Sequence, residues 1–175
     1  MIDARVIPVL SAGSADDAER TCRALLADGL DTVEITFRTE AAADAIRRVS
    51  TIDGLRVGAG TVLSVEQLQA AVDAGAQFAV APSTNPAVVD AAQRAGILFI
   101  PGAATPTEID RARSLGCDVI KIFPAAVVGG PAFIRAVSAV FPDVKFIPTG
   151  GITAETVDDY LALPSVLACG GTWLT

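Results

Sequence analysis

Short apolar runs rich in valine and isoleucine recur about every 20 to 25 residues along the chain. Each run is followed by a polar or glycine-containing turn and then by a segment with the 3.6-residue period of a helix. This pattern predicts eight strands, at residues 6–10, 32–36, 56–60, 77–81, 98–101, 118–123, 144–148 and 166–169. Because the runs are apolar almost throughout, both faces of each strand should be buried, as in a parallel sheet covered by helices.

The segments between these strands carry the start and stop signals of helices. Capping side chains precede four of them, at Ser14, Ser64, Asn85 and Thr105, and residues 64–67 match a capping box. Glycines that favour a left-handed ending close four of them, at Gly29, Gly75, Gly96 and Gly116. Eight alternations without a linker predict a single domain over residues 1–175, an α/β fold in the form of a closed (β/α)8 TIM barrel.

The sequence stops at Thr175, just after the eighth predicted strand. No residues remain for the helix that would cover the seam between the last and first strands. Since barrels of this kind usually run to about 200 residues or more, we expect a TIM barrel that lacks its final C-terminal helix. Two explanations are open: the sequence is a portion of a longer protein, or another subunit covers the seam.

Charge and cysteine usage narrow the range of partners. With 13 basic and 20 acidic residues, the net charge of −7 disfavours binding to nucleic acid or to an anionic membrane. No apolar run approaches the roughly 20 residues that cross a bilayer. Cys22, Cys117 and Cys169 are widely spaced in apolar surroundings, as is typical of buried thiols in a reducing cytoplasm. We therefore expect a cytoplasmic protein that acts on small molecules.

The sequence contains no histidine. This excludes Ser-His and Cys-His nucleophile pairs and any imidazole-ligated metal site, so proton transfer falls to a carboxylate, lysine, tyrosine or cysteine. The absence of a CxxC spacing also argues against structural zinc. We expect neither a metal nor a cofactor.

Lys121 is the most informative single residue, because it interrupts the apolar strand Val119-Ile120-Lys121-Ile122-Phe123. An ammonium group placed there loses hydration, and a lysine held partly neutral in a dry pocket is a nucleophile for carbonyl compounds. The alternative is a lysine that reaches the barrel mouth or is neutralised by a structural carboxylate. Lys145 is the only other lysine, and its place at the start of a predicted strand puts it at the wrong end of the barrel.

Glu34 is the corresponding charge on the second predicted strand, with Thr36 and Arg38 at alternating positions on the same face. A carboxylate facing the interior is unfavourable unless it is paired or used in catalysis. Glu34 is thus a candidate general acid and base, and we expect Arg38 to bind a substrate carboxylate through two hydrogen bonds. The alternative is a salt bridge from Glu34 to Arg38 or Lys121 without a role in proton transfer.

Glycine pairs follow the seventh predicted strand, at 150–151, and the eighth, at 170–171. Barrels of this type commonly bind phosphate at these loops through backbone N–H groups and a helix start, which we expect near Thr172 and Trp173. Tight turns alone are the alternative. Residues 58–60, Gly-Ala-Gly, lack the third glycine of a dinucleotide fingerprint, and we attribute them to turn geometry.

Five segments at the predicted strand ends are informative when taken together: 34–39 (EITFRT), 58–62 (GAGTV), 121–125 (KIFPA), 148–152 (PTGGI) and 170–174 (GGTWL). In this order, and over nearly the whole chain, they resemble the bacterial 2-keto-3-deoxy-6-phosphogluconate (KDPG) and 4-hydroxy-2-oxoglutarate (KHG) aldolases. The resemblance implies a homotrimer, without metal or cofactor, that reversibly cleaves KDPG to pyruvate and glyceraldehyde 3-phosphate. Its partners would be a small 2-keto acid and a phosphorylated aldehyde. Cleavage of KHG to pyruvate and glyoxylate is a second candidate reaction.

The same resemblance implies roles for individual residues. Lys121 would form the Schiff base, Glu34 would be the acid and base, and Arg38 would bind the pyruvate carboxylate. The pyruvate pocket would be lined by Thr61, Pro82, Phe123 and Thr149. The phosphate would be held by Gly150, Gly151, Gly171 and Thr172. Thr172 stands where the family pattern has serine, which keeps the hydroxyl and adds a methyl group, and Thr149 is similar to the gluconate-type rather than the galactonate-specific enzymes.

Two other functions stay open on the sequence alone. A sugar-phosphate isomerase or epimerase would use the same phosphate site and Glu34 alone for proton transfer. Retained turnover in a Lys121→Ala variant would favour it. A non-catalytic scaffold or binding subunit would fit the missing helix, and normal folding and trimerisation without a pyruvate adduct would favour that function.

Overall fold

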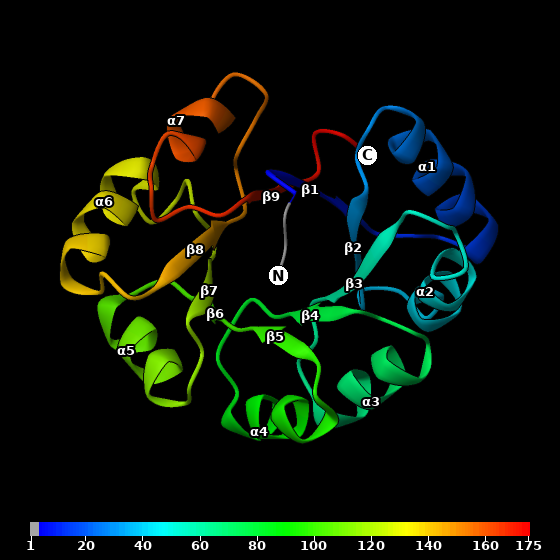
Figure 1. The fold of residues 1–175 in the computed structure, drawn as a ribbon, viewed down its shortest axis with the longest axis horizontal. Helices are drawn as coiled ribbons and strands as arrows, with labels where there is room; N and C mark the ends of the chain where they lie inside the picture. Colours follow the sequence, from blue (N-terminus) through cyan, green and yellow to red (C-terminus); the bar gives the residue numbers. More distant parts are fainter. Residues whose placement is uncertain (1–3) are drawn as a thin grey trace.

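The structure is a computed structural model that describes residues 4–175. Figure 1 shows strands arranged around a common axis, with the helices on the outside. Within the described residues the strands are β1 (Val6–Leu10), β2 (Thr32–Thr36), β3 (Arg56–Gly60), β4 (Phe78–Val80), β5 (Leu98–Ile100), β6 (Gly102–Ala103), β7 (Val119–Ile122), β8 (Lys145–Pro148) and β9 (Cys169–Gly171). The helices are α1 (Ala15–Ala27), α2 (Ala42–Val49), α3 (Val65–Asp73), α4 (Pro86–Ala95), α5 (Pro106–Ser114), α6 (Gly130–Val140) and α7 (Val157–Leu161).

The prediction of a closed eight-stranded TIM barrel is wrong. In residues 4–175 the strands form a curled six-stranded parallel sheet, in the order β5-β4-β3-β2-β1-β9, and a separate three-stranded sheet, β6-β7-β8. The run predicted as one strand at 98–101 ends at Ile100, and β6 begins after Pro101, which has no N–H group to donate to a ladder. On the other side, the chain around β8 and the chain up to and including β9 are linked, among the described residues, by isolated bridges from Phe146 to Val166 and from Thr149 to Gly170.

The last strand also lies elsewhere than predicted. β9 covers Cys169–Gly171 rather than 166–169, because Gly170 and Gly171 pair with Ile7 and Pro8 of β1. The second glycine pair is therefore strand rather than loop. In the part of the chain that is described, no helix begins at Thr172 and none follows β9.

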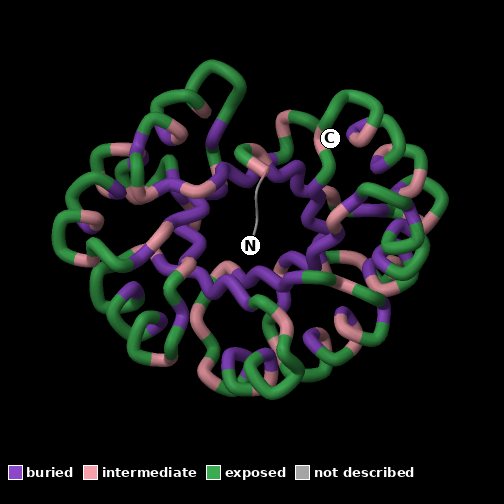
Figure 2. The backbone as a smooth tube through the Cα atoms, viewed as in Figure 1, coloured by how far each residue is buried: buried purple, intermediate pink, exposed green. Residues whose placement is uncertain are grey.

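The burial pattern agrees with the prediction that the strands are covered on both faces. Figure 2 shows the buried segments concentrated along the strands and on the helix sides that face them. Outward side chains such as Val33, Ile35 and Ile120 pack against the helices. A smaller inner cluster fills the space around the axis; it consists of Ile7, Phe78, Val80, Ile100, Ile147 and Ala168. Between Ala4 and Thr175 the buried polar or charged residues are Thr32, Glu34, Thr36, Lys121 and Thr149.

The helix signals read from the sequence are mostly confirmed. The hydroxyl of Thr105 accepts a hydrogen bond from the Glu108 backbone N–H (3.3 Å), and the Glu108 carboxylate accepts one from the Thr105 N–H (3.0 Å), which completes a capping box. At 64–67 the box is only half formed, because the Gln67 side chain accepts from the Leu63 N–H (2.7 Å) instead of from Ser64. The closing glycines 29, 75, 96 and 116 all have positive φ. No helix within residues 4–175 is long and apolar enough to cross a membrane.

The cysteines are free and buried, which leads to a test of the packing around them. Burial raises the pKa of Cys22 from 9.0 to about 11 and that of Cys169 to about 12, and burial beside Asp118 also raises the pKa of Cys117. Because the thiolate is the reactive form, native Cys22 and Cys169 should react with iodoacetamide at pH 8 at least about 100-fold more slowly than in the urea-unfolded chain, and native Cys117 should also react more slowly. Mass spectrometry of timed samples measures this ratio, and complete alkylation of the native protein at the unfolded rate would contradict it.

Candidate active site

Two buried, oppositely charged side chains meet between the two sheets. Glu34 comes from β2 of the larger sheet and Lys121 from β7 of the smaller one, which Figure 1 shows on opposite sides of the axis. Their exposed fractions are 3% and 4%, and Lys121 Nζ donates to Glu34 Oε1 at 3.5 Å. Burial removes hydration from both groups, and their mutual attraction and hydrogen bonding offset part of that cost. The pair therefore places an amine and a carboxylate together in a dry site.

The inward direction of these side chains follows from strand alternation. Ile120 and Ile122 pack in the outer core against the helices, so Lys121 between them points toward the axis. Val33 and Ile35 flank Glu34 in the same way. The backbone of Lys121 is held by its N–H, which donates to the Pro101 carbonyl at 2.8 Å. The local sequence pattern thus sets the direction of each side chain, and the two curled sheets bring them together.

The loop after β7 and the end of β8 line the same region. Lys121 Nζ lies 5.5 Å from the centroid of the Phe123 ring, within the range of a cation–π contact. A Cβ added to Gly150 would lie 3.3 Å from that ring, so Gly150 packs directly on it. Thr149 is 7% exposed, and its Oγ1 is the buried side-chain polar atom that has no hydrogen-bond partner among residues 4–175. A buried hydroxyl without a partner is unfavourable, which makes it a candidate contact for a bound polar group.

Arg38 does not share the buried environment of Glu34. β2 ends at Thr36, whose hydroxyl bonds to that of Ser11 (2.8 Å), and a turn begins at Phe37. The alternation read from the sequence therefore stops before Arg38, which is exposed. Within the described residues no hydrogen bond or ion pair holds its guanidinium, and the partner of Glu34 is Lys121.

Thr61 and Pro82 flank the site from the ends of β3 and β4. Thr61 is half-buried with φ +56°, the one positive φ of a non-glycine residue in the described part of the chain. Such a conformation is strained for a β-branched residue. Pro82 is half-buried and packs on Gly102, where an added Cβ would lie 2.1 Å from the Pro82 carbonyl carbon. Since Gly102 pairs with Lys121, Pro82 lies one strand away from the lysine.

The residues expected to hold phosphate lie at the ends of β8 and β9. Gly150 and Gly151 follow β8 with φ of +99° and +75°, so this turn requires glycine. The bridge between Thr149 and Gly170 brings it beside β9. Gly171 is buried in β9 under the Trp173 ring, and Thr172 is exposed next to it. The four predicted residues are thus brought to one edge, although only the first pair forms a loop.

One contact of the site was missed by sequence reasoning. Gly58 and Gly60 were attributed to turn geometry, but both lie inside β3. A Cβ at Gly60 would lie 2.1 Å from Glu34 Oε1, so the carboxylate rests directly on this glycine. Two glycines at alternate positions of one predicted strand were the available signal, because a strand-interior glycine often marks a close approach.

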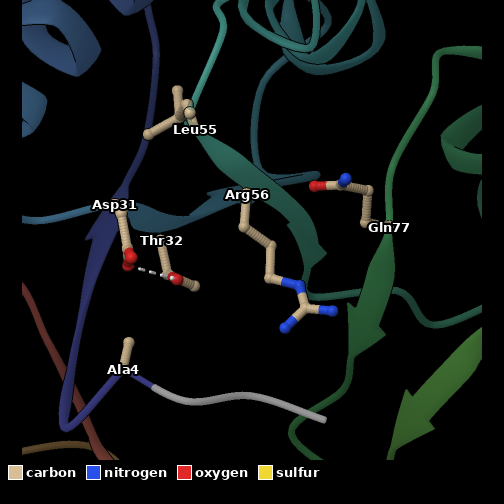
Figure 3. Close-up of a pocket in the computed structure, with 7 residues that line it drawn as sticks. Ala4, Asp31, Thr32, Leu55, Arg56 and Gln77 are labelled. Carbon is tan, nitrogen blue, oxygen red and sulfur yellow. Dashed lines mark hydrogen bonds between the residues drawn. The ribbon is translucent and has the colours of Figure 1, made fainter.

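The cavity drawn in Figure 3 lies away from this charged pair. It has a volume of about 360 Å³ and is lined by Ala4, Asp31, Thr32, Gly54, Leu55, Arg56 and Gln77. Asp31, Thr32 and Arg56 stand at the starts of β2 and β3, whereas the side chains described above gather toward the strand ends. Neither Glu34 nor Lys121 lines this cavity. The candidate active site is therefore the buried pair, and this cavity lies outside it.

Comparison with known proteins gives a consistent set of relatives. A family model described as KDPG and KHG aldolase matches residues 1–175. The 2-dehydro-3-deoxy-phosphogluconate aldolase of Treponema pallidum is 46% identical over 171 residues, which make up 97% of this chain and 81% of that protein. The KHG/KDPG aldolase of Escherichia coli is 41% identical over 170 residues, which make up 97% of this chain and 80% of that one.

A solved structure agrees with these relatives. The KDPG aldolase from Legionella pneumophila, with pyruvate captured at low pH as a covalent carbinolamine intermediate, superposes with a TM-score of 0.93 and 39% identity. The match covers 98% of this chain and 84% of that one. A dipeptide epimerase from Methylococcus capsulatus reaches a TM-score of 0.70 at 14% identity over 97% of this chain and 56% of that one, which shows a likeness of fold alone.

Proposed function

The chain belongs to the KDPG and KHG aldolase family, and from this membership we propose which of its residues perform the reaction. The protein is a class I aldolase that cleaves KDPG to pyruvate and glyceraldehyde 3-phosphate, and KHG activity is named among its relatives. Neither the family model nor the relatives named above supports the isomerase or the scaffold alternative. The observation that carries our assignment of residues is the buried pair of Lys121 Nζ and Glu34 Oε1 at 3.5 Å.

Lys121 is the nucleophile in this proposal. Its neutral amine attacks the C2 ketone of the substrate to give a carbinolamine, and loss of water gives the Schiff base. The iminium nitrogen then accepts the electron pair released when the C3–C4 bond breaks, which leaves the aldehyde and an enamine. Protonation of the enamine carbon and hydrolysis release pyruvate and restore the amine. Lys145 is unsuited to this role. It lies at the start of β8, and its ammonium donates a hydrogen bond to the Pro164 carbonyl (3.2 Å).

Glu34 moves the protons of these steps in the proposal. The reaction requires a group that protonates the carbinolamine oxygen, removes the proton of the C4 hydroxyl and returns one to the enamine carbon. The Glu34 carboxylate is the acidic side chain in contact with Lys121 Nζ in the described structure. Since one carboxylate both accepts and donates, a single residue can serve the successive steps.

Arg38 and the strand-end residues bind the two ends of the substrate. The exposed Arg38 guanidinium would close on the pyruvate carboxylate, with which it can form two parallel hydrogen bonds. Thr61, Pro82, Phe123 and Thr149 would line the pyruvate part of the site. The phosphate would bind at Gly150, Gly151, Gly171 and Thr172, which gather beside the bridge between Thr149 and Gly170. Thr172 would supply the hydroxyl at the position where the family pattern has serine.

We further propose a single aldolase domain over residues 1–175 that assembles as a homotrimer and works in the cytoplasm without metal or cofactor. The free, buried cysteines support a reducing compartment. Light scattering of the purified protein at several concentrations tests the trimer.

A direct assay tests the proposed activity. Purified protein should release pyruvate from KDPG, measured by coupling to lactate dehydrogenase, at a rate that is unchanged after treatment with a strong chelator. KHG in the same assay, with glyoxylate as the second product, ranks the two substrates. Absence of pyruvate release from both substrates would contradict the assignment, and loss of activity with the chelator would contradict the metal-free mechanism.

The unpartnered hydroxyl of Thr149 gives a prediction that separates binding from stability. Replacing Thr149 with valine removes a buried polar atom that has no partner in the described structure, so the midpoint of thermal unfolding should stay the same or rise. If the hydroxyl hydrogen-bonds to the substrate, kcat/KM for KDPG should fall about tenfold, the worth of one such bond. A lower unfolding midpoint with unchanged kcat/KM would show a structural role instead.

A further inference from the structure

The Glu34 carboxylate occupies the space that a side chain at position 60 would need. Gly60 ends β3, pairs with Thr36 of β2, and lies diagonally next to Glu34 on the same face of the sheet. A Cβ built on Gly60 would lie 2.1 Å from Glu34 Oε1, 2.6 Å from Cγ and 2.7 Å from Cδ. Real Cβ atoms essentially never come closer than 3.0 Å to another atom. Any residue other than glycine must therefore displace the carboxylate or the backbone.

The backbone is held in place, so the carboxylate has to move. β2 and β3 pair along their whole length, from Thr32 opposite Arg56 to Thr36 opposite Gly60. The Gly60 carbonyl also accepts a hydrogen bond from the Phe37 N–H at 2.8 Å. Glu34 is 3% exposed, and its Oε1, the atom nearest to the added Cβ, is the same atom that receives the hydrogen bond from Lys121.

We propose that Gly60 is a positioning residue of the aldolase: its missing side chain leaves the space in which the Glu34 carboxylate is held against Lys121 Nζ. This inference rests on the proposed function, in which Glu34 transfers protons at the substrate bound to Lys121. Gly60 itself touches no reacting atom. It acts through the carboxylate, and the strength of that coupling can be measured.

Gly58 provides a matched control on the same strand and the same face. A Cβ at Gly58 would lie 2.2 Å from the Phe78 ring, a member of the inner apolar cluster, and its three nearest atoms all belong to that ring, although Gly58 pairs with Glu34 across the ladder. Gly58→Ala therefore collides first with the Phe78 ring of the apolar core, whereas Gly60→Ala collides first with the carboxylate. Gly13 provides a second control, because it is exposed and an added Cβ would meet only Asp17 Oδ2, at 3.6 Å.

The experiment is a double-mutant cycle on kcat for KDPG with Gly60→Ala, Glu34→Ala and the double variant. We expect Gly60→Ala to lower kcat by about 100-fold in the wild-type background, the lower end of the effect of a lost general acid and base, with KM within about threefold. In the Glu34→Ala background, where the atoms that the methyl group meets are gone, the same substitution should change kcat by less than about threefold. Gly13→Ala should retain wild-type kcat, and Gly58→Ala should lower the unfolding midpoint and act equally in both backgrounds.

Each outcome decides the question. Equal losses from Gly60→Ala in both backgrounds, or wild-type kcat in the single variant, would overturn the positioning role. If Gly60→Ala fails to fold, folding of the double variant supports the inference, because removal of the carboxylate then relieves the collision; failure of the double variant, while Glu34→Ala folds, overturns it. A Glu34→Ala variant with wild-type kcat would instead contradict the proposed function, so the two failures are distinguishable.

Discussion

Replacing Lys121 with methionine is expected to abolish both aldolase turnover and the covalent capture of pyruvate. Methionine keeps most of the side-chain volume in a position that is 4% exposed, but its thioether cannot add to a ketone. Removal of a catalytic nucleophile lowers kcat on the order of 10⁴- to 10⁶-fold, and the same loss is expected here. Borohydride added to wild-type protein with pyruvate should give the mass of one reduced pyruvate per chain, whereas Lys121→Met should give none.

Lys145→Met is the matched control for this experiment, because Lys145 is the only other lysine in the chain. It should retain both the adduct and turnover, since its ammonium donates to the Pro164 carbonyl (3.2 Å) rather than to a group of the site. A peptide map of the trapped wild-type protein should place the adduct on residue 121. An adduct that persists in Lys121→Met and maps to the chain N-terminus would refute the proposed nucleophile.

The charged pair was predictable because each partner breaks a local pattern. Lys121 and Glu34 both stand in runs of valine and isoleucine, and strand alternation gave their direction once the runs were assigned as strands. The bounds of β1, β2 and β3 were predicted for the same reason, since local apolar character defines them. The resemblance to known aldolases then supplied the roles that local patterns cannot give.

The largest differences from the sequence prediction depend on contacts between distant segments. The division of the sheet at Pro101 depends on which neighbour each side of that proline pairs with, β4 for β5 and β7 for β6. The position of β9 depends on its pairing with β1, more than 150 residues earlier in the chain. The proximity of Gly60 to the Glu34 carboxylate arises from the diagonal packing of two paired strands. Such partners are set by tertiary structure, and a one-dimensional pattern does not specify them.

Substrate binding depends both on the net charge of the chain and on the charged groups next to the site. The net charge of −7 repels an anionic sugar acid at long range, so binding has to come from nearby cations and backbone N–H groups. Lys121 forms an ion pair with Glu34 before the substrate binds. Arg38, just after β2, is exposed and has no ion-pair partner among the described residues, so its charge is available to the substrate. Affinity for KDPG should therefore depend on Arg38 more than on Lys121, whose contribution is to bond formation.

Replacing Glu34 with glutamine should separate the formation of the Lys121 adduct from turnover. The amide has nearly the same shape and can still accept a hydrogen bond from Lys121 Nζ through its oxygen, but it cannot take up and release a proton. Loss of a general acid and base lowers kcat by about 10²- to 10⁴-fold, and we expect a loss in this range for KDPG cleavage. Borohydride should still trap pyruvate on Lys121, at a lower rate, because the amine itself remains.

Thr32→Val is the control for Glu34→Gln, because Thr32 is a buried polar residue of the same strand, 3% exposed, whose hydroxyl bonds to Asp31 (3.0 Å) away from Lys121. Its kcat should stay within about threefold of wild type, as expected for loss of one hydrogen bond outside the site. Should Glu34→Gln keep kcat within the same limits, Glu34 would be a structural counter-ion of Lys121, and the proton carrier would have to be another group. Should turnover fall while trapping continues, the carboxylate is required after the amine has reacted, which is the stage at which the C3–C4 bond breaks and the enamine is protonated.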